Sequence, residues 1–227
     1  MKETTQTSET SGTKMLLTMT GIGVICALLI VLSFQGTLPR IEQLKAEALE
    51  KAIFKVVPGM VSKRTFRMES DGSLTEVSGK EKDARLVYAG YDAEGKLVGV
   101  AVEAAGMGFA DVIKVLYGYD PAKEAVVGFY VLESKETPGL GDKIEKDAAF
   151  LANFEALDVS LSEDKSKTKN TVVAVKKGKK QNNWEVDGIT GATISSRAIG
   201  NIMGTSTADM APVLYKNKDF FEVKKGQ

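Results

Sequence analysis

The residues best suited to chemistry lie between positions 184 and 196, at a predicted joint between a strand and a helix. The only tryptophan, Trp184, begins the strand at residues 184–186, and apolar residues recur from Ile194 with the spacing of a helix. The first turn of a helix exposes unpaired N–H groups and carries a partial positive charge, so it stabilises a phosphate without any basic side chain. The joint itself has the sequence Asp187-Gly188-Ile189-Thr190-Gly191-Ala192-Thr193.

Small residues make the start of this predicted helix accessible to a phosphate. Gly191 and Ala192 allow a close approach, Thr193 places a hydroxyl at the helix start, and Arg197 lies one turn further on. The alternative is that the threonine, serine and aspartate residues are ordinary N-caps, which is their commoner use at a helix start. The local sequence leaves both interpretations open.

A second constrained segment lies upstream, with the sequence Glu136-Thr137-Pro138-Gly139-Leu140-Gly141. Pro138 fixes one φ angle, whereas Gly139 and Gly141 permit positive ones, so the pattern predicts a rigid loop. Such a loop can hold a planar ligand, with backbone polar groups at the edge of the ligand and Leu140 against its face. The alternative is a turn that only shapes the backbone.

The composition excludes several kinds of site. The chain has no histidine and one cysteine, Cys26, which excludes a His/Cys zinc site, a Cys-His nucleophile and an intrachain disulfide. We therefore predict no catalytic residue and no metal ligand, and any redox chemistry has to come from a cofactor. The 30 basic and 30 acidic residues cancel, so the charge gives no reason to expect nucleic acid as a partner.

In this order, the two segments resemble the signatures of the FMN-binding domain shared by RnfG and NqrC subunits. The resemblance implies a phosphoester between FMN and Thr193, formed when a flavin transferase cleaves FAD, with Asp187 taking part in recognition or activation. Asp142-Lys143-Ile144 continues the match in the manner of RnfG. The cofactor contacts expected besides Thr193 are Asp187, Thr190, Gly191, Ala192, Glu136, Thr137, Gly139 and Leu140.

Two positions depart from the family pattern. Relatives often carry a histidine where Ser134 and Lys135 stand, and a glycine pair where Phe109 is followed by Ala110. Both departures affect flanking positions and leave the attachment threonine in place.

The resemblance further implies a membrane-anchored electron relay in an Rnf-type complex, which passes electrons between ferredoxin and NAD and couples this transfer to sodium or proton transport. The implied partners are the flavin transferase and the other membrane and peripheral subunits of such a complex. No G-x-G-x-x-G nicotinamide fingerprint lies between a predicted strand and helix, which favours a relay over a dehydrogenase. The alternatives are an NqrC-like or stand-alone flavin carrier, and a non-redox module that binds an anion.

A membrane anchor is predicted near the N-terminus. Residues 15–38 carry no charge and are long enough to span a bilayer, so we expect one transmembrane helix after a disordered cytoplasmic tail at residues 1–14. Pro39-Arg40 are expected to end this helix. The basic residues after the span favour a cytoplasmic domain under the positive-inside rule. The resemblance places the domain on the outer face of the inner (cytoplasmic) membrane, and we adopt that orientation.

Residues 39–227 are predicted to form the FMN-binding domain, an α+β fold with an antiparallel sheet and flanking helices. Two similar stretches, each a strand, a polar turn and a strand, indicate hairpins at 85–103 and 112–132. An amphipathic helix is expected at 41–57. The other predicted elements are short strands within 60–82, a helix at 150–156, a strand at 171–175, a helix at 194–215 interrupted at Gly200, Gly204 and Pro212, and a strand-like segment at 219–225.

Overall fold

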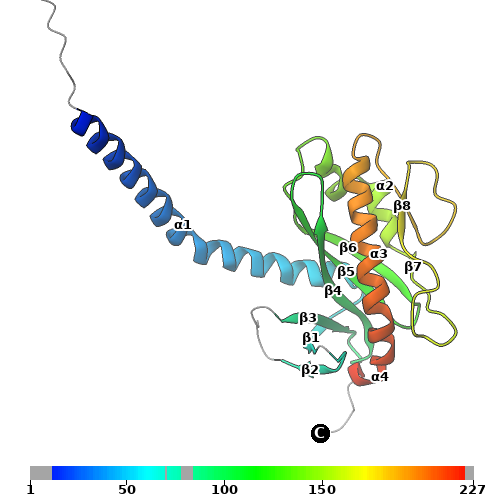
Figure 1. Ribbon diagram of the computed structural model, residues 1–227. Helices are drawn as coiled ribbons and strands as arrows, with labels where there is room; N and C mark the ends of the chain where they lie inside the picture. The colour runs from blue at the N-terminus through cyan, green and yellow to red at the C-terminus, as the bar shows by residue number, and fades with distance from the viewer. Residues whose placement is uncertain (1–11, 70, 78–83, 223–227) are drawn as a thin grey trace, which may run out of the picture. The chain divides into compact units, whose positions relative to one another are not determined.

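The N-terminal part of the protein is a long apolar helix. The computed structural model describes residues 12–69, 71–77 and 84–222, and its first element is α1, Gly12–Val56 (Figure 1). The apolar side chains in the first part of α1 are exposed. Within the described ranges, α1 is the one helix long and apolar enough to cross a membrane, which fits the predicted single-pass anchor.

The predicted end of this helix at Pro39-Arg40 is wrong, because α1 continues through Pro39. A proline inside a helix removes one backbone hydrogen bond and crowds the carbonyl four residues earlier. The residues that follow are rich in Leu, Ala, Glu and Lys, which are strong helix formers, and they offset this local cost. Residues 12–14 also belong to α1 and not to a tail, while residues 1–11 of the predicted tail lie outside the described residues.

The chain divides after Glu47, and the second unit, from Ala48 onward, is built on an antiparallel sheet. The strand order is β2-β1-β3-β4-β5-β6-β7, and every described pairing in this sheet is antiparallel. The two predicted hairpins are confirmed as β3–β4 and β5–β6. The strands are β1 Ser62–Met68, β2 Leu74–Glu76, β3 Arg85–Tyr91, β4 Leu97–Met107, β5 Val112–Asp120, β6 Ala125–Glu133 and β7 Leu157–Asp158.

One face of the sheet packs on the last two turns of α1. Ile53 and Val56 are buried there. Gly118 and Gly128 pair across β5 and β6, and a Cβ at either position would overlap the carbonyl oxygen of Val56. The missing side chains therefore let the helix end lie directly on the sheet backbone.

The other face of the sheet holds the main core under α3, Thr193–Lys216 (Figure 1). Its predicted interruptions are wrong, since α3 is continuous through both glycines and Pro212. A Cβ at Gly200 would lie 2.6 Å from the Ala174 nitrogen, and one at Gly204 would lie 2.5 Å from the Val172 oxygen. These glycines allow a close contact between α3 and strand β8 rather than a break in the helix.

Strand β8, Val173–Val175, pairs in parallel with β9, Glu185–Asp187. The sequence predicts both strands but not their parallel pairing. This two-stranded sheet leads the chain from β9 into the turn before α3.

Short helical turns complete the domain. The predicted helix at 150–156 is confirmed in part, by α2 at Ala148–Leu151 and the 3-10 turn η2 at Ala152–Phe154; another 3-10 turn, η1, spans Gly141–Glu145. The predicted strand-like segment at 219–225 is wrong where it is described, because α4, Lys218–Phe221, is helical. Phe221 is buried beside Phe66 and its carbonyl accepts a hydrogen bond from the Tyr91 hydroxyl, so tertiary packing decides this end. Positions 223–225 lie outside the described residues.

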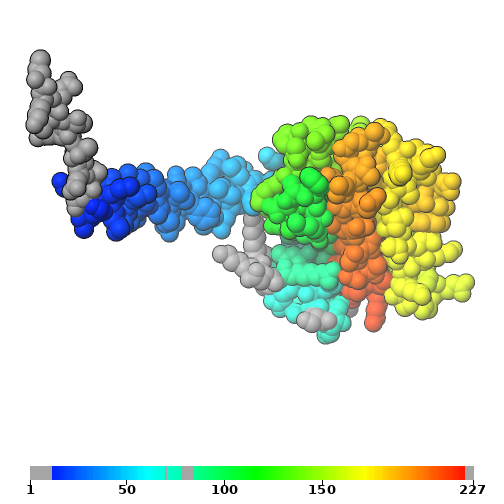
Figure 2. Space-filling view, turned by 45° about the horizontal axis from the view of Figure 1, so that its top comes forward, coloured from blue at the N-terminus to red at the C-terminus, as the bar shows by residue number. Residues whose placement is uncertain are grey.

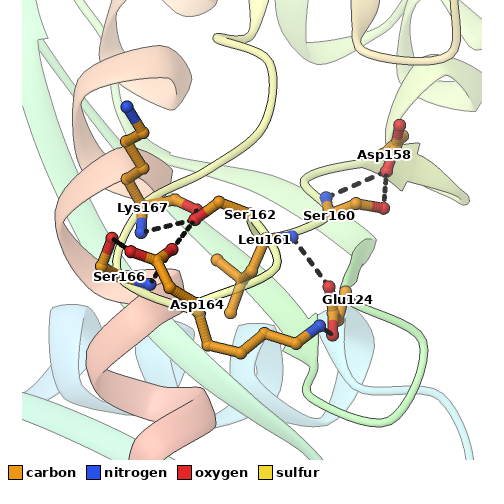
Figure 3. Close-up of polar contacts among 9 residues, drawn as sticks. Glu124, Asp158, Ser160, Leu161, Ser162, Asp164, Ser166 and Lys167 are labelled. Atoms are coloured by element: carbon orange, nitrogen blue, oxygen red, sulfur yellow. Dashed lines mark hydrogen bonds and ion pairs between the residues drawn. The ribbon is translucent and has the colours of Figure 1, made fainter.

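The long loop between β7 and β8 is organised by side-chain acceptors (Figure 3). The Glu124 carboxylate accepts from the Leu161 N–H at 2.7 Å, and Asp158 accepts from the Ser160 N–H at 2.9 Å. Hydrogen bonds from Ser162 and Ser166 lower the pKa of the Asp164 carboxyl to about 2. The polar groups of this cluster bind one another, so we assign it to the fold.

Candidate functional site

A cavity of about 320 Å³ lies where three segments meet. These segments are the loop after β4, the loop after β6 and the start of α3; Figure 2 shows the green surface of the first two against the orange surface of α3. The two sequence motifs, far apart in the chain, therefore contribute to one site. The cavity is lined by Phe109, Glu136, Thr137, Leu140, Gly141, Gly191, Ala192, Thr193, Ile194 and Ser195.

The turn before α3 leaves the helix start open. Gly191 has a φ of +84°, a left-handed conformation that favours glycine, and the Ala192 N–H donates to the Ile189 carbonyl at 3.1 Å. Ala192 occupies the N-cap position, and no side chain caps the helix. The Ser196 hydroxyl instead accepts from the Ile189 N–H at 3.0 Å. The alternative that these hydroxyl residues are ordinary N-caps is therefore wrong.

Thr193, the first residue of α3, is exposed. Its hydroxyl makes no hydrogen bond to the described part of the chain. It lies at the positive end of a 24-residue helix whose first N–H groups lack a capping side chain. The position combines an accessible hydroxyl with the electrostatic setting that a phosphate requires.

Lys143 brings a positive charge to the same turn. A Cβ built on Gly191 would lie 3.9 Å from the Lys143 Nζ. The neighbouring Asp142 is bound by Lys146 at 2.6 Å, which lowers the pKa of the Asp142 carboxyl. No described carboxylate forms an ion pair with Lys143, so its ammonium group is available to an anion at the helix start.

Glu136 is a predicted cofactor contact, but its carboxylate is instead bonded to protein. The side chain is 5% exposed. One oxygen accepts from the N–H groups of Phe109 and Ala110 at 2.8 and 2.9 Å, and the other accepts from the Ser195 hydroxyl. Glu136 lines the cavity, but its hydrogen bonds join the cavity's walls to each other.

Three predicted contacts lie outside the cavity lining. The Asp187 carboxylate accepts from the Gly178 N–H at 2.7 Å and so turns toward the basic loop at 176–180. Thr190 is exposed beside the turn. Gly139, with a φ of +78°, lies after Pro138 in a tight turn closed by a 3.1 Å hydrogen bond from the Leu140 N–H to the Thr137 carbonyl. For Gly139 the backbone-shaping alternative describes the structure.

Sequence reasoning does not assign Phe109, Ile194 and Ser195 to the site. Phe109 is 63% exposed and Ile194 54% exposed, and with Leu140 at 53% they form an apolar rim around Thr193. The signal for Phe109 is an aromatic residue directly after Gly108 in a loop. The helical spacing places Ile194 in the buried stripe of α3, but this residue lies too close to the helix start to reach the core.

The cavity thus has two chemically different parts. One is an anion-binding end formed by the start of α3, Thr193 and Lys143. The other is an apolar rim of exposed side chains, an arrangement that marks binding sites on soluble surfaces. A ligand with a phosphate at one end and a flat, largely apolar ring at the other fits both parts.

Comparisons with known proteins agree with this geometry. The FMN-binding domain family matches residues 108–206, a range that holds every residue lining the cavity. The G subunit of the ion-translocating oxidoreductase complex of Methanosarcina acetivorans is 31% identical over 192 residues, which cover 82% of this chain and 88% of that protein. The chain belongs to the family of these G subunits. A further member, the G subunit of the Na⁺-translocating ferredoxin:NAD⁺ oxidoreductase complex of Acetobacterium woodii, is 28% identical over 86% of this chain and 87% of its own length.

Solved structures support the fold of this G-subunit family member. NqrC of Shewanella oneidensis superimposes with a TM-score of 0.59 at 19% identity, covering 80% of this chain and all of that one. The corresponding protein of the Na⁺-translocating NADH-quinone reductase of Parabacteroides distasonis gives 0.58 at 20% identity, covering 77% and 96%. The predicted α+β fold, an apolar helix followed by an antiparallel sheet with flanking helices, is confirmed.

Proposed function

We propose that the protein is a membrane-anchored flavoprotein subunit that carries electrons on FMN attached covalently through its phosphate to Thr193. The observation that supports this proposal is the exposed Thr193 hydroxyl, without a hydrogen-bond partner among the described residues, at the open start of α3 in the cavity formed by both motifs. Thr193 presents the acceptor oxygen. The helix N–H groups and Lys143 stabilise the negative charge of the phosphate beside it.

Attachment requires a flavin transferase with FAD as the donor. The Thr193 Oγ1 forms a bond to the FMN phosphorus, the pyrophosphate bond of FAD breaks, AMP leaves, and the hydroxyl proton is released. Gly191 and Ala192 contribute by leaving little side-chain bulk on the path to this oxygen. Asp187 holds the neighbouring basic loop through Gly178, which gives the transferase an ordered surface next to the acceptor.

The apolar rim holds the ring system. Phe109, Leu140 and Ile194 surround the cavity and exclude water from the ring face. FMN, when bound, supplies one- and two-electron redox chemistry that the side chains of this protein lack. The protein's own contribution is therefore binding, orientation and control of the local environment.

The partners follow from the G-subunit relatives. The Acetobacterium woodii relative is named as part of a Na⁺-translocating ferredoxin:NAD⁺ oxidoreductase. We propose the same setting here, a relay between the ferredoxin and NAD branches of an Rnf-type complex with other membrane and peripheral subunits. One apolar helix encloses no ion path by itself, so ion transport is assigned to those partners.

The direct experiment is expression of the full chain with and without a flavin transferase, followed by a denaturing gel under ultraviolet light. We expect a yellow-green fluorescent band at the mass of the protein only when the transferase is present. A protein that never shows this band while it still binds inorganic phosphate would support the non-redox anion-binding alternative.

Leu140→Ala is expected to retain covalent flavin and to change its midpoint potential. Attachment uses Thr193, whereas the exposed Leu140 side chain lies at the cavity rim. Its removal admits water, which stabilises charged reduced forms and shifts the potential to more positive values. Redox titration of equally loaded proteins measures this shift, with Val61→Ala, which removes an exposed apolar side chain outside the cavity lining, as the control. A potential unchanged in Leu140→Ala would make this loop a backbone-shaping turn.

The proposed orientation places the domain on the outer face of the membrane. Protease added to intact spheroplasts is then expected to digest the domain, while a cytoplasmic marker protein stays intact. Antibody against the C-terminal region measures the loss of full-length protein. Digestion only after lysis would reverse the orientation and support the positive-inside count.

A further inference from the structure

A single buried carboxylate lies at the junction of the three segments that form the flavin cavity. Glu136 belongs to the loop after β6, its Oε1 binds the N–H groups of Phe109 and Ala110 in the loop after β4, and its Oε2 binds Ser195 in the first turn of α3. All three donors point to the carboxylate, which as an ionised acceptor satisfies each of them. No other described side chain links all three segments by hydrogen bonds.

Two glycines leave space for this carboxylate. A Cβ at Gly108 would lie 2.6 Å from Glu136 Oε1, and a Cβ at Gly141 would lie 2.5 Å from Oε2 and 2.8 Å from the Ser195 Oγ. Neither glycine has a positive φ, so backbone conformation does not require glycine at these positions. The surroundings are therefore shaped to hold the side chain of Glu136.

We propose that Glu136 is a positioning residue that holds the Phe109 loop against the start of α3, so that the flavin cavity is formed before the flavin is attached. This inference rests on the proposed attachment at Thr193. The loop has further support, from the Gly108 N–H to the Asp111 carbonyl at 2.9 Å and from an ion pair between Lys135 and Asp111. Loss of Glu136 therefore loosens the loop and separates it from the helix without unfolding the domain.

Three substitutions separate geometry from charge. Glu136→Ala removes all three hydrogen bonds, and Ser195→Ala removes only the link to the helix. Glu136→Gln keeps the geometry, because the amide oxygen accepts from the two N–H groups while the amide nitrogen donates to the Ser195 Oγ. Glu145→Ala is the matched control, since it removes an exposed carboxylate from the adjacent 3-10 turn, outside the flavin cavity.

The first measurement is hydrogen exchange of the full-length protein without flavin, in detergent. In Glu136→Ala the amides of Phe109 and Ala110 are expected to exchange about tenfold faster or more, because a hydrogen bond to a charged group provides protection of that order. In Glu136→Gln, Ser195→Ala and Glu145→Ala these two amides are expected to exchange at nearly the original rate. This readout needs no flavin, so it is independent of whether Thr193 is the attachment site.

The second measurement is the rate at which the transferase loads flavin onto each variant. We expect slower loading in Glu136→Ala, a smaller decrease in Ser195→Ala, and rates close to the original in Glu136→Gln and Glu145→Ala. Unchanged exchange in Glu136→Ala would overturn the positioning role, as would faster exchange accompanied by unchanged loading. Failure of the unmodified protein to load at all would instead count against the proposed function and leave the exchange result to be judged alone.

Discussion

Thr193→Ala is expected to abolish flavin that survives denaturation while the domain remains folded. The side chain is exposed and makes no hydrogen bond to the described residues, so its loss removes no packing and no cap from α3. The expected change in stability is below about 0.5 kcal/mol, as for other surface substitutions. In-gel fluorescence measures the attached flavin, and the thermal transition followed by Trp184 fluorescence measures the fold.

Two further variants make this result specific. Thr205→Ala removes an exposed threonine from the same helix, outside the cavity, and is expected to load flavin normally. Thr193→Ser keeps a hydroxyl at the helix start and is expected to retain part of the loading. Covalent FMN at full yield in Thr193→Ala would move the attachment to another residue.

The two binding motifs could be predicted from the sequence because each is a local pattern. The glycines and proline of 136–141 give a tight turn, and the residues before Thr193 give an open helix start. Whether a given side chain faces the ligand depends on distant segments. Glu136 turns toward Phe109 and Ser195, and Asp187 turns toward Gly178, so both differ from the predicted contacts.

The errors in the fold have the same origin. Gly200 and Gly204 weaken a helix by intrinsic propensity, but α3 passes so close to β8 that only glycine fits at these positions. Pro39 favours the end of a helix that strong helix formers carry onward. At residues 218–221 the burial of Phe221 selects a helical turn over an extended strand. In each case packing or the neighbouring residues outweighed the preference of a single residue.

Gly118→Ala is expected to give the largest loss of stability. Its Cβ would overlap the carbonyl oxygen of Val56, which belongs to the backbone and moves only if the end of α1 moves. Overpacking a buried site of this kind costs about 3 kcal/mol. The unfolding transition of the full-length protein in detergent, before flavin attachment, measures the loss. Trp184 fluorescence reports unfolding of the sheet domain itself.

The control for this prediction is Gly95→Ala, in the turn between β3 and β4. Gly95 has a φ of +78°, and a Cβ at this position would have no atom within 4 Å, so alanine there adds backbone strain without a contact. Such strain costs about 1 kcal/mol. Gly118 has an ordinary φ, so a markedly larger loss in Gly118→Ala isolates the contact with α1. Equal losses in the two variants would mean that the end of α1 moves away freely, and that the paired glycines Gly118 and Gly128 do not fix the helix on the sheet.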